Sequence, residues 1–191
     1  MRTSRVLFLV FLISLFVIIF VFNIYLVEYQ EAYEAINHRL KVGIYLLFLT
    51  LISSEFALLE IQIEGKHGWA QKLPTKLYNG SWWKKLFAGK APTGYHLILM
   101  LLFLPTIFHL PFFFTTWDLF KECIVLGSFF FFIVVEDFMW FVFNPEFGLK
   151  KFNSRNKDIW WHNKWFGLLP DYYLEGLLLS AIFLSIGLPH L

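Results

Sequence analysis

Three side chains that could bind a metal recur at helical spacing near the end of an apolar stretch: Glu60, Glu64 and His67. Because an α-helix advances by about 100° per residue, positions i, i+4 and i+7 lie on one face. Carboxylate oxygens and imidazole nitrogens are ligands for Zn, Fe or Mn. The spacing therefore predicts a metal-binding or catalytic stripe. The alternative is a helix end whose charges face the water among lipid headgroups.

The adjacent carboxylates Glu136 and Asp137 lie within another apolar stretch. An ionisable side chain inside hydrocarbon costs at least about 2.5–3.5 kcal/mol on insertion scales, so its presence needs a reason. Two neighbouring carboxylates in lipid require cations, protons or strong hydrogen-bond donors. We expect both to be functional, with Glu136 as a metal ligand and a carboxylate that binds no metal as general base. The alternative is a structural hydrogen-bonded cluster with Trp140, Asn144 and either Lys84 or Lys85.

A further candidate is His162, which stands among three tryptophans in the segment 159–165. In an ordered turn this histidine could bind a metal or transfer a proton, whereas a bond to a nearby carbonyl is the structural alternative. His96, at the start of a later apolar stretch, is a reserve ligand. The predicted metal ligands are Glu60, Glu64, His67, Glu136 and His162. The predicted catalytic residues are Glu136, Asp137 and His162.

The elements that must position these side chains are membrane helices. Of the 191 residues, 58% are hydrophobic and only 16% are charged, whereas an ordinary soluble domain is about 25% charged. A helix needs about 20 apolar residues to cross a bilayer. Five stretches are long enough, and they cover residues 6–27, 42–63, 95–115, 124–143 and 173–188. We therefore predict an all-α, polytopic membrane helix bundle of five transmembrane helices, forming a single domain over residues 1–191.

The distribution of basic residues predicts the orientation of this bundle. All but three of the 16 lysines and arginines precede the first span or lie in the loops 65–91 and 150–170; the exceptions are Arg39, Lys41 and Lys121. The positive-inside rule then places the N-terminus in the cytoplasm and the C-terminus outside. Both loops mix tryptophan with lysine, which is typical of segments lying in the membrane interface. By this topology, all the candidate site residues share one layer near the cytoplasmic face.

The sequence also excludes several function classes. The single cysteine, Cys123, excludes a disulfide scaffold. A net charge of +2 without a basic face gives no indication of nucleic-acid binding. The HExxH, GxSxG and phosphate-loop motifs are absent from the sequence, so the chemistries that depend on them are not expected.

We expect a small integral membrane enzyme with a cytoplasm-facing site of carboxylate and histidine side chains. The ligand types favour a divalent metal, Zn, Fe or Mn, as cofactor. The expected partners are the lipid bilayer and a lipid or other amphipathic small molecule, and a homo-oligomer is left open. The alternative is a proton- or cation-coupled transporter or a membrane accessory protein, in which Glu136 and Asp137 act as a relay.

Overall fold

The computed structural model describes residues 10, 13–21, 24, 37–65, 67–87, 89–162 and 164–190, which are mostly helical. Within this part of the chain, four helical segments are long and apolar enough to cross a membrane: His38–Glu64, Gly94–Phe113, Leu119–Phe143 and Asp171–His190. They correspond to the last four predicted spans. The first predicted span, 6–27, is described in part, and its residues 13–21 are helical. The rest of that span lies outside the described residues.

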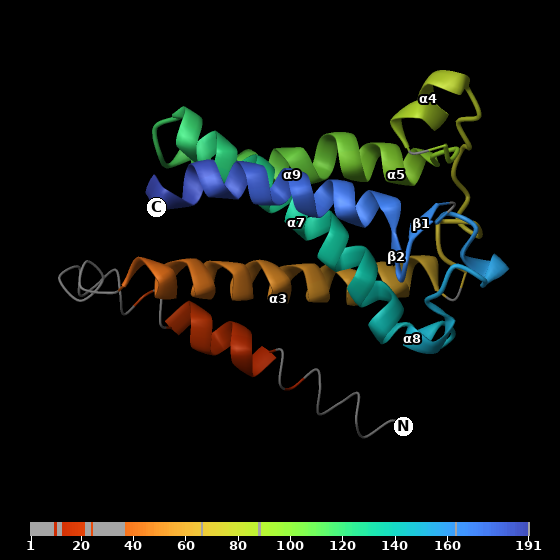
Figure 1. The fold of residues 1–191 in the computed structure, drawn as a ribbon, viewed down its shortest axis with the longest axis horizontal. Helices are drawn as coiled ribbons and strands as arrows, with labels where there is room; N and C mark the ends of the chain where they lie inside the picture. The colour runs from red at the N-terminus through yellow and green to blue at the C-terminus, as the bar shows by residue number, and fades with distance from the viewer. Residues whose placement is uncertain are drawn as a thin grey trace.

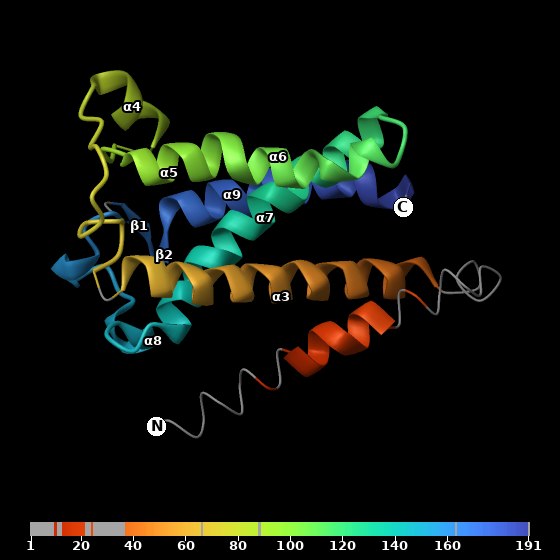
Figure 2. The ribbon, with the colours of Figure 1, turned by 180° about the vertical axis from the view of Figure 1, so that it is seen from behind.

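The central helix of the bundle is α7 (Leu119–Phe143), which packs against both α3 (His38–Glu64) and α9 (Asp171–Gly187). Figures 1 and 2 show α7 crossing α3 obliquely, with α9 and the segment from α5 to α6 on the other side of α7. Three glycines let α7 and α9 approach closely. A Cβ atom at Gly127 would lie 2.7 Å from Leu184 Cγ. Cβ atoms at Gly176 and Gly187 would likewise lie within 3 Å of side chains of α7. Small residues at such crossings are typical of membrane helix pairs.

The span Gly94–Phe113 is not a regular α-helix. It runs through α5 (Gly94–Ile98), a π-helical turn η1 (Leu99–Phe103), α6 (Leu104–His109) and a 3-10 turn η2 (Leu110–Phe113). Proline has no amide hydrogen, so Pro105 cannot donate to the carbonyl four residues earlier. The wider π-helical turn ends at Phe103, two residues before this proline.

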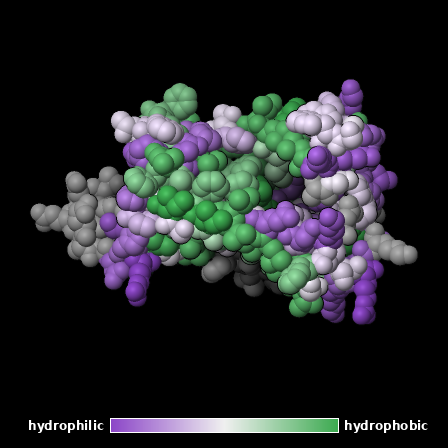
Figure 3. All heavy atoms as spheres, turned by 45° about the horizontal axis from the view of Figure 1, so that its top comes forward, coloured by the Kyte–Doolittle hydropathy of each residue, from purple (hydrophilic) through white to green (hydrophobic). Residues whose placement is uncertain are grey.

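The two basic loops lie at the same end of the bundle (Figures 1 and 2). The loop after α3 contains α4 (Ser81–Leu86). The loop after α7 contains α8 (Gly148–Lys151), a 3-10 turn η3 (Lys157–Ile159) and an antiparallel hairpin of β1 (Trp165–Phe166) with β2 (Leu169–Pro170). A last 3-10 turn, η4 (Leu188–His190), follows α9. On the face shown in Figure 3, hydrophilic side chains gather towards the ends of the molecule and hydrophobic ones lie between them.

An aromatic core joins the second basic loop to the helix ends. Trp140 and Phe141 of α7 pack with Ile159 and Trp161 of the loop and with Ala57 of α3. The carbonyl of Gly65, at the end of α3, accepts a hydrogen bond of 3.2 Å from Asn144 Nδ2 at the end of α7. These contacts fix the loops over the helix ends that carry the acidic side chains.

Candidate functional site

A cavity of about 540 Å³ lies between the helices at the end of the bundle that carries the basic loops. Its volume falls within the range of about 300–1,000 Å³ that small-molecule sites occupy. One part of its lining is polar and the other part is apolar. Polar side chains come from α3, α5, α7, α9 and the first basic loop: Glu60, Glu64, Lys90, His96, Glu136, Asp137, Tyr172 and Glu175. The remainder includes apolar side chains of the membrane spans, such as Met100, Phe129 and Ile133.

Glu60, Glu64 and His96 form a buried group that could hold a metal ion. One potential ligand atom from each of the three lies within 4.8 Å of those of the other two. Glu60 and Glu64 are one turn apart on α3, while His96 comes from the first turn of α5. All three residues are less than 8% exposed. Two carboxylates and one imidazole suit Zn, Fe or Mn.

Neighbouring residues hold His96 in a fixed orientation. Its Nδ1 atom shares a hydrogen bond of 2.8 Å with Thr93 Oγ1, the N-cap of α5. Its Nε2 atom lies 3.7 Å from Glu64 Oε1. The ring stacks on Trp69 with 4.1 Å between centroids, and Trp69 Nε1 donates to the carbonyl of Ala91 at 3.1 Å. A histidine oriented through its Nδ1 atom leaves Nε2 for a metal or a carboxylate, as in many metal sites.

Glu64 also organises the chain that follows α3. Gly68, Trp69 and Ala70 all have positive φ angles, of 56°, 50° and 50°. This conformation is unfavourable for residues other than glycine, so it requires compensation by surrounding contacts. The amide of Ala70 donates a hydrogen bond of 2.5 Å to Glu64 Oε1. Glu64 therefore stabilises the turn that brings Trp69 against His96.

Glu136 adds a third carboxyl group beside this cluster. It is 3% exposed, and its carboxyl faces that of Glu60 closely enough to share a hydrogen bond when one of them carries a proton. The Oε1 atom of Glu136 has no hydrogen-bond partner among the described residues. Tyr95 Oη donates to Glu60 Oε1 at 3.1 Å, but no basic side chain in the described part of the chain lies at ion-pair distance from Glu60 or Glu136. A bound cation or a shared proton must therefore balance these charges.

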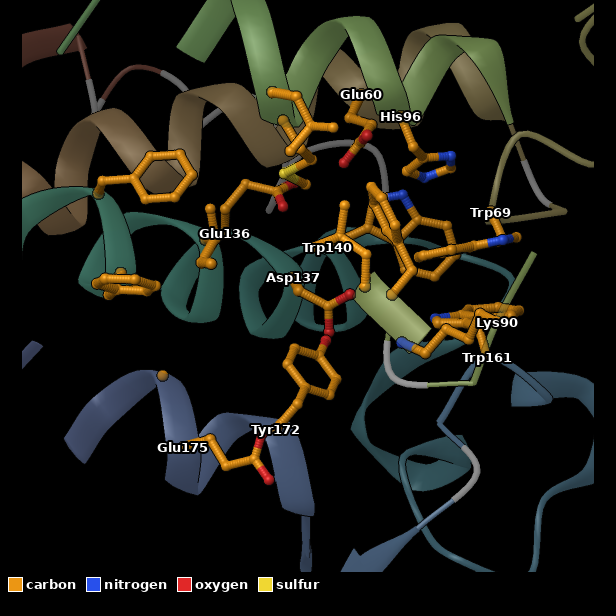
Figure 4. A pocket seen from close by; sticks show the side chains of 18 of the residues that line it. Glu60, Trp69, Lys90, His96, Glu136, Asp137, Trp140, Trp161, Tyr172 and Glu175 are labelled. Atoms are coloured by element: carbon orange, nitrogen blue, oxygen red, sulfur yellow. The ribbon is translucent and has the colours of Figure 1, made fainter. Parts of the chain in front are cut away.

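Asp137 forms a second polar centre on the other side of the cavity. Tyr173 Oη of α9 donates a hydrogen bond to Asp137 Oδ2, and His162 Nε2 lies 3.3 Å from the same oxygen. Figure 4 shows the Tyr172 side chain also directed at this carboxylate. The His162 side chain is fully buried, whereas that of Asp137 is 23% exposed and lines the cavity. A molecule in the cavity can therefore reach Asp137, and His162 and the tyrosines orient this carboxylate.

Lys90 is the basic side chain of the cavity lining, and it lies outside the membrane-spanning segments. It is 7% exposed, and its Nζ atom stands 4.8 Å from the ring centre of Trp69 and 4.5 Å from that of Tyr172. Burial lowers the pKa of Lys90 from its ordinary value of 10.5 to about 8, although the charges of Asp137 and Asp171 act in the opposite direction.

This lowered pKa predicts a pH dependence of stability. Between pH 8 and 10.5 the folded Lys90 is largely neutral while the unfolded chain still binds the proton, so unfolding takes up a proton and stability rises with pH. Thermal unfolding in detergent at pH 7 to 10 should show the wild type gaining stability relative to Lys90→Met. The exposed Lys85 provides the control, since Lys85→Met should keep the wild-type pH profile. A constant difference between wild type and Lys90→Met would contradict the prediction.

The structure brings together some of the predicted site residues and separates others. Glu60, Glu64, Glu136 and Asp137 line one cavity, and His162 lies beside Asp137 rather than in the group of potential metal ligands. His67 is neither in that group nor in the cavity lining, because α3 ends at Gly65 with a φ angle of 68°. The reserve ligand His96 takes its place.

Sequence reasoning did not assign Lys90 or the two tyrosines to the site. Lys90 is one of several lysines in an aromatic-rich loop, and Tyr172 and Tyr173 begin an apolar span. The sequence signal that could have indicated the tyrosines is their position at the basic end of a span, because buried tyrosine hydroxyls need a hydrogen-bond partner such as a carboxylate.

The sequence matches no family model, and neither the curated proteins nor the solved structures contain a significant match to this chain.

Proposed function

We propose that this protein is a metal-dependent integral membrane enzyme that acts on an amphipathic small molecule. The observation that carries the proposal is the divided cavity, which joins the buried Glu60–Glu64–His96 group to an apolar region within the membrane spans. A lipid-like molecule matches both parts, because its reactive head can meet the polar groups while its chain stays in an apolar environment.

Each polar group has a distinct part in the proposed chemistry. Glu60, Glu64 and His96 would hold a divalent ion, with Glu136 beside Glu60 as a further oxygen ligand or proton carrier. The metal would supply Lewis-acid polarisation of the substrate head. Asp137 would accept or return a proton as general base. His162 and Tyr173 act as positioning residues, because they contact Asp137 but are not part of the cavity lining.

The proposed membrane arrangement has five spans, with the N-terminus in the cytoplasm and the C-terminus outside. The positive-inside distribution of the lysines and arginines supports this orientation. The clustering of both basic loops at one end of the bundle (Figure 1) agrees with it. Their tryptophans would then lie in the cytoplasmic membrane interface, next to the polar part of the cavity.

Elemental analysis of the purified protein in detergent tests the metal. We expect Zn, Fe or Mn at close to one ion per chain in the wild type, and its loss in Glu60→Gln and His96→Gln. His109→Gln is the matched control, since His109 lies in the same span but outside the group. His162→Gln should also retain the ion. A correctly folded wild type without metal, or equal metal in all variants, would overturn the proposed metal site.

Lipid turnover tests the enzymatic part of the proposal. Mass spectrometry of lipids from membranes containing the wild type should show a species that is depleted or formed, and Asp137→Asn should abolish this change. Identical lipid profiles would count against an enzyme. They would favour a second candidate, a proton relay, which the facing carboxyls of Glu60 and Glu136 support. In that case proton flux into proteoliposomes should disappear in Glu136→Gln.

A further inference from the structure

Lys90 has an unusual environment for a buried lysine. Its Nζ atom contacts the faces of Trp69 and Tyr172, but no hydrogen bond or ion pair of this atom is present within the described part of the chain. Cation–π contacts stabilise a cation by less than the free energy that burying an unpaired charge costs. The two aromatic rings therefore hold the amine in place without neutralising it.

The acidic groups around Lys90 do not complete an ion pair with it. Asp137 and Asp171 are the carboxylates whose charges act on the amine, yet neither lies within 4.0 Å of it. Asp137 is already bonded to Tyr173 and lies beside His162. In Figure 4 the Lys90 side chain extends into the same cavity as Asp137, Tyr172 and His96. An anionic group in this cavity would gain a charge-assisted bond that no protein side chain supplies.

Trp69 links Lys90 to the proposed metal group. Its ring stacks on that of His96 with 4.1 Å between ring centroids, and the Lys90 Nζ atom lies 4.8 Å from the centre of the same ring. The amine and the ligand group thus flank one polar space, and an anionic head placed there could contact both.

The apolar part of the cavity is open towards the lipid. Leu101 and Leu179 line it and are 42% and 39% exposed, although both belong to membrane spans. Phe129, Phe130 and Ile133 of α7 form the opposite apolar wall. An acyl or isoprenoid chain could therefore pass laterally from the bilayer into the cavity, with its head directed to Lys90.

We infer that the cavity binds an amphiphile with an anionic head, a phosphate or a carboxylate, which Lys90 recognises. This inference rests on the proposed function, because it names the substrate class of the same site. A neutral or cationic head would leave the buried amine without an anionic partner, so we expect such a molecule to bind more weakly.

Binding measurements on the metal-replete protein in a non-ionic detergent test the inference. We would titrate dodecyl phosphate, dodecanoate, dodecanol and dodecyltrimethylammonium by calorimetry. The anionic compounds should bind at least about tenfold more tightly than the other two, as expected for one charge-assisted bond. Lys90→Met should remove this preference, whereas Lys90→Arg should preserve most of it. Lys85→Met is the control, because Lys85 is exposed and does not line the cavity.

Two further measurements distinguish an amphiphilic ligand from free phosphate, and a failure of this inference from a failure of the proposed metal site. Inorganic phosphate should compete at least about tenfold more weakly than dodecyl phosphate, because it lacks the apolar chain; equal competition would overturn an amphiphilic ligand. Metal content, measured on the same samples, should not change in Lys90→Met. If the protein contains no metal but still binds anionic amphiphiles preferentially, and Lys90→Met removes this preference, the proposed metal site is refuted and the inference is upheld. Equal binding of all four compounds to the wild type, or an unchanged preference in Lys90→Met, would overturn it.

Discussion

Replacing Gly68 by alanine is expected to lower the free energy of unfolding by about 2–5 kcal/mol. The φ angle of Gly68 is 56°, and an added Cβ atom would lie 2.6 Å from Trp161 and 3.1 Å from Trp140. Neither ring can move aside easily, because both belong to the buried aromatic core. The substitution therefore combines a left-handed backbone with overpacking, and thermal unfolding in detergent would measure the loss.

Gly167 provides a matched control for Gly68. Its φ angle is 62°, but nothing lies within 4 Å of a Cβ atom added there. Gly167→Ala should therefore show only the backbone cost of about 1–2 kcal/mol. If the two variants lose the same stability, the packing of Trp161 and Trp140 against Gly68 is not important for the fold.

The Gly68 variant should also impair metal binding. Gly68 begins the turn whose Ala70 amide donates to Glu64 and whose Trp69 ring stacks on His96. A shift of this turn would displace two of the three potential ligands. Metal content should fall in Gly68→Ala and remain at the wild-type level in Gly167→Ala.

The membrane spans could be predicted from the sequence because their signal is local. Apolar composition alone located α3, α7, α9 and the segment Gly94–Phe113, within a few residues at most ends. The pairing of Glu60 with Glu64 was also local, since one helical turn separates them. The same reasoning extended the stripe to His67, but Gly65 ends α3 in the left-handed region and takes His67 off the helix face.

The rest of the candidate site depends on tertiary packing. His96 joins Glu60 and Glu64 because α5 lies against the end of α3, and the spacing of residues along the chain does not encode that contact. Lys90 is held by Trp69 from one loop and Tyr172 from the fourth described span. Periodicity indicates which face of a helix is polar, but it does not indicate which loop covers that face.

Asp137→Ala is expected to lower the free energy of unfolding by about 3–5 kcal/mol, as for other buried polar networks that lose one partner. The Tyr173 hydroxyl would lose its acceptor, and buried His162 would lose the neighbouring carboxylate. Asp137→Asn keeps an acceptor oxygen, so it should lose roughly 1–2 kcal/mol. Thermal unfolding would measure both variants, with Asp158→Ala, an exposed site on η3, as the control. Equal stability of Asp137→Ala and Asp158→Ala would show that this network does not stabilise the fold.

Asp137→Asn provides a second readout at Lys90. The Asp137 charge raises the pKa of Lys90 against the effect of burial, so its removal should lower that pKa below the wild-type value of about 8. The carbon chemical shift of reductively methylated Lys90, followed by NMR against pH, would report the change, and Lys90→Met would assign the signal. An unchanged pKa would mean that solvent screens Asp137 from the amine. A lowered pKa would show that the proposed general base and the proposed anion-binding amine share one desolvated cavity, so that an anionic head bound by Lys90 would lie beside Asp137.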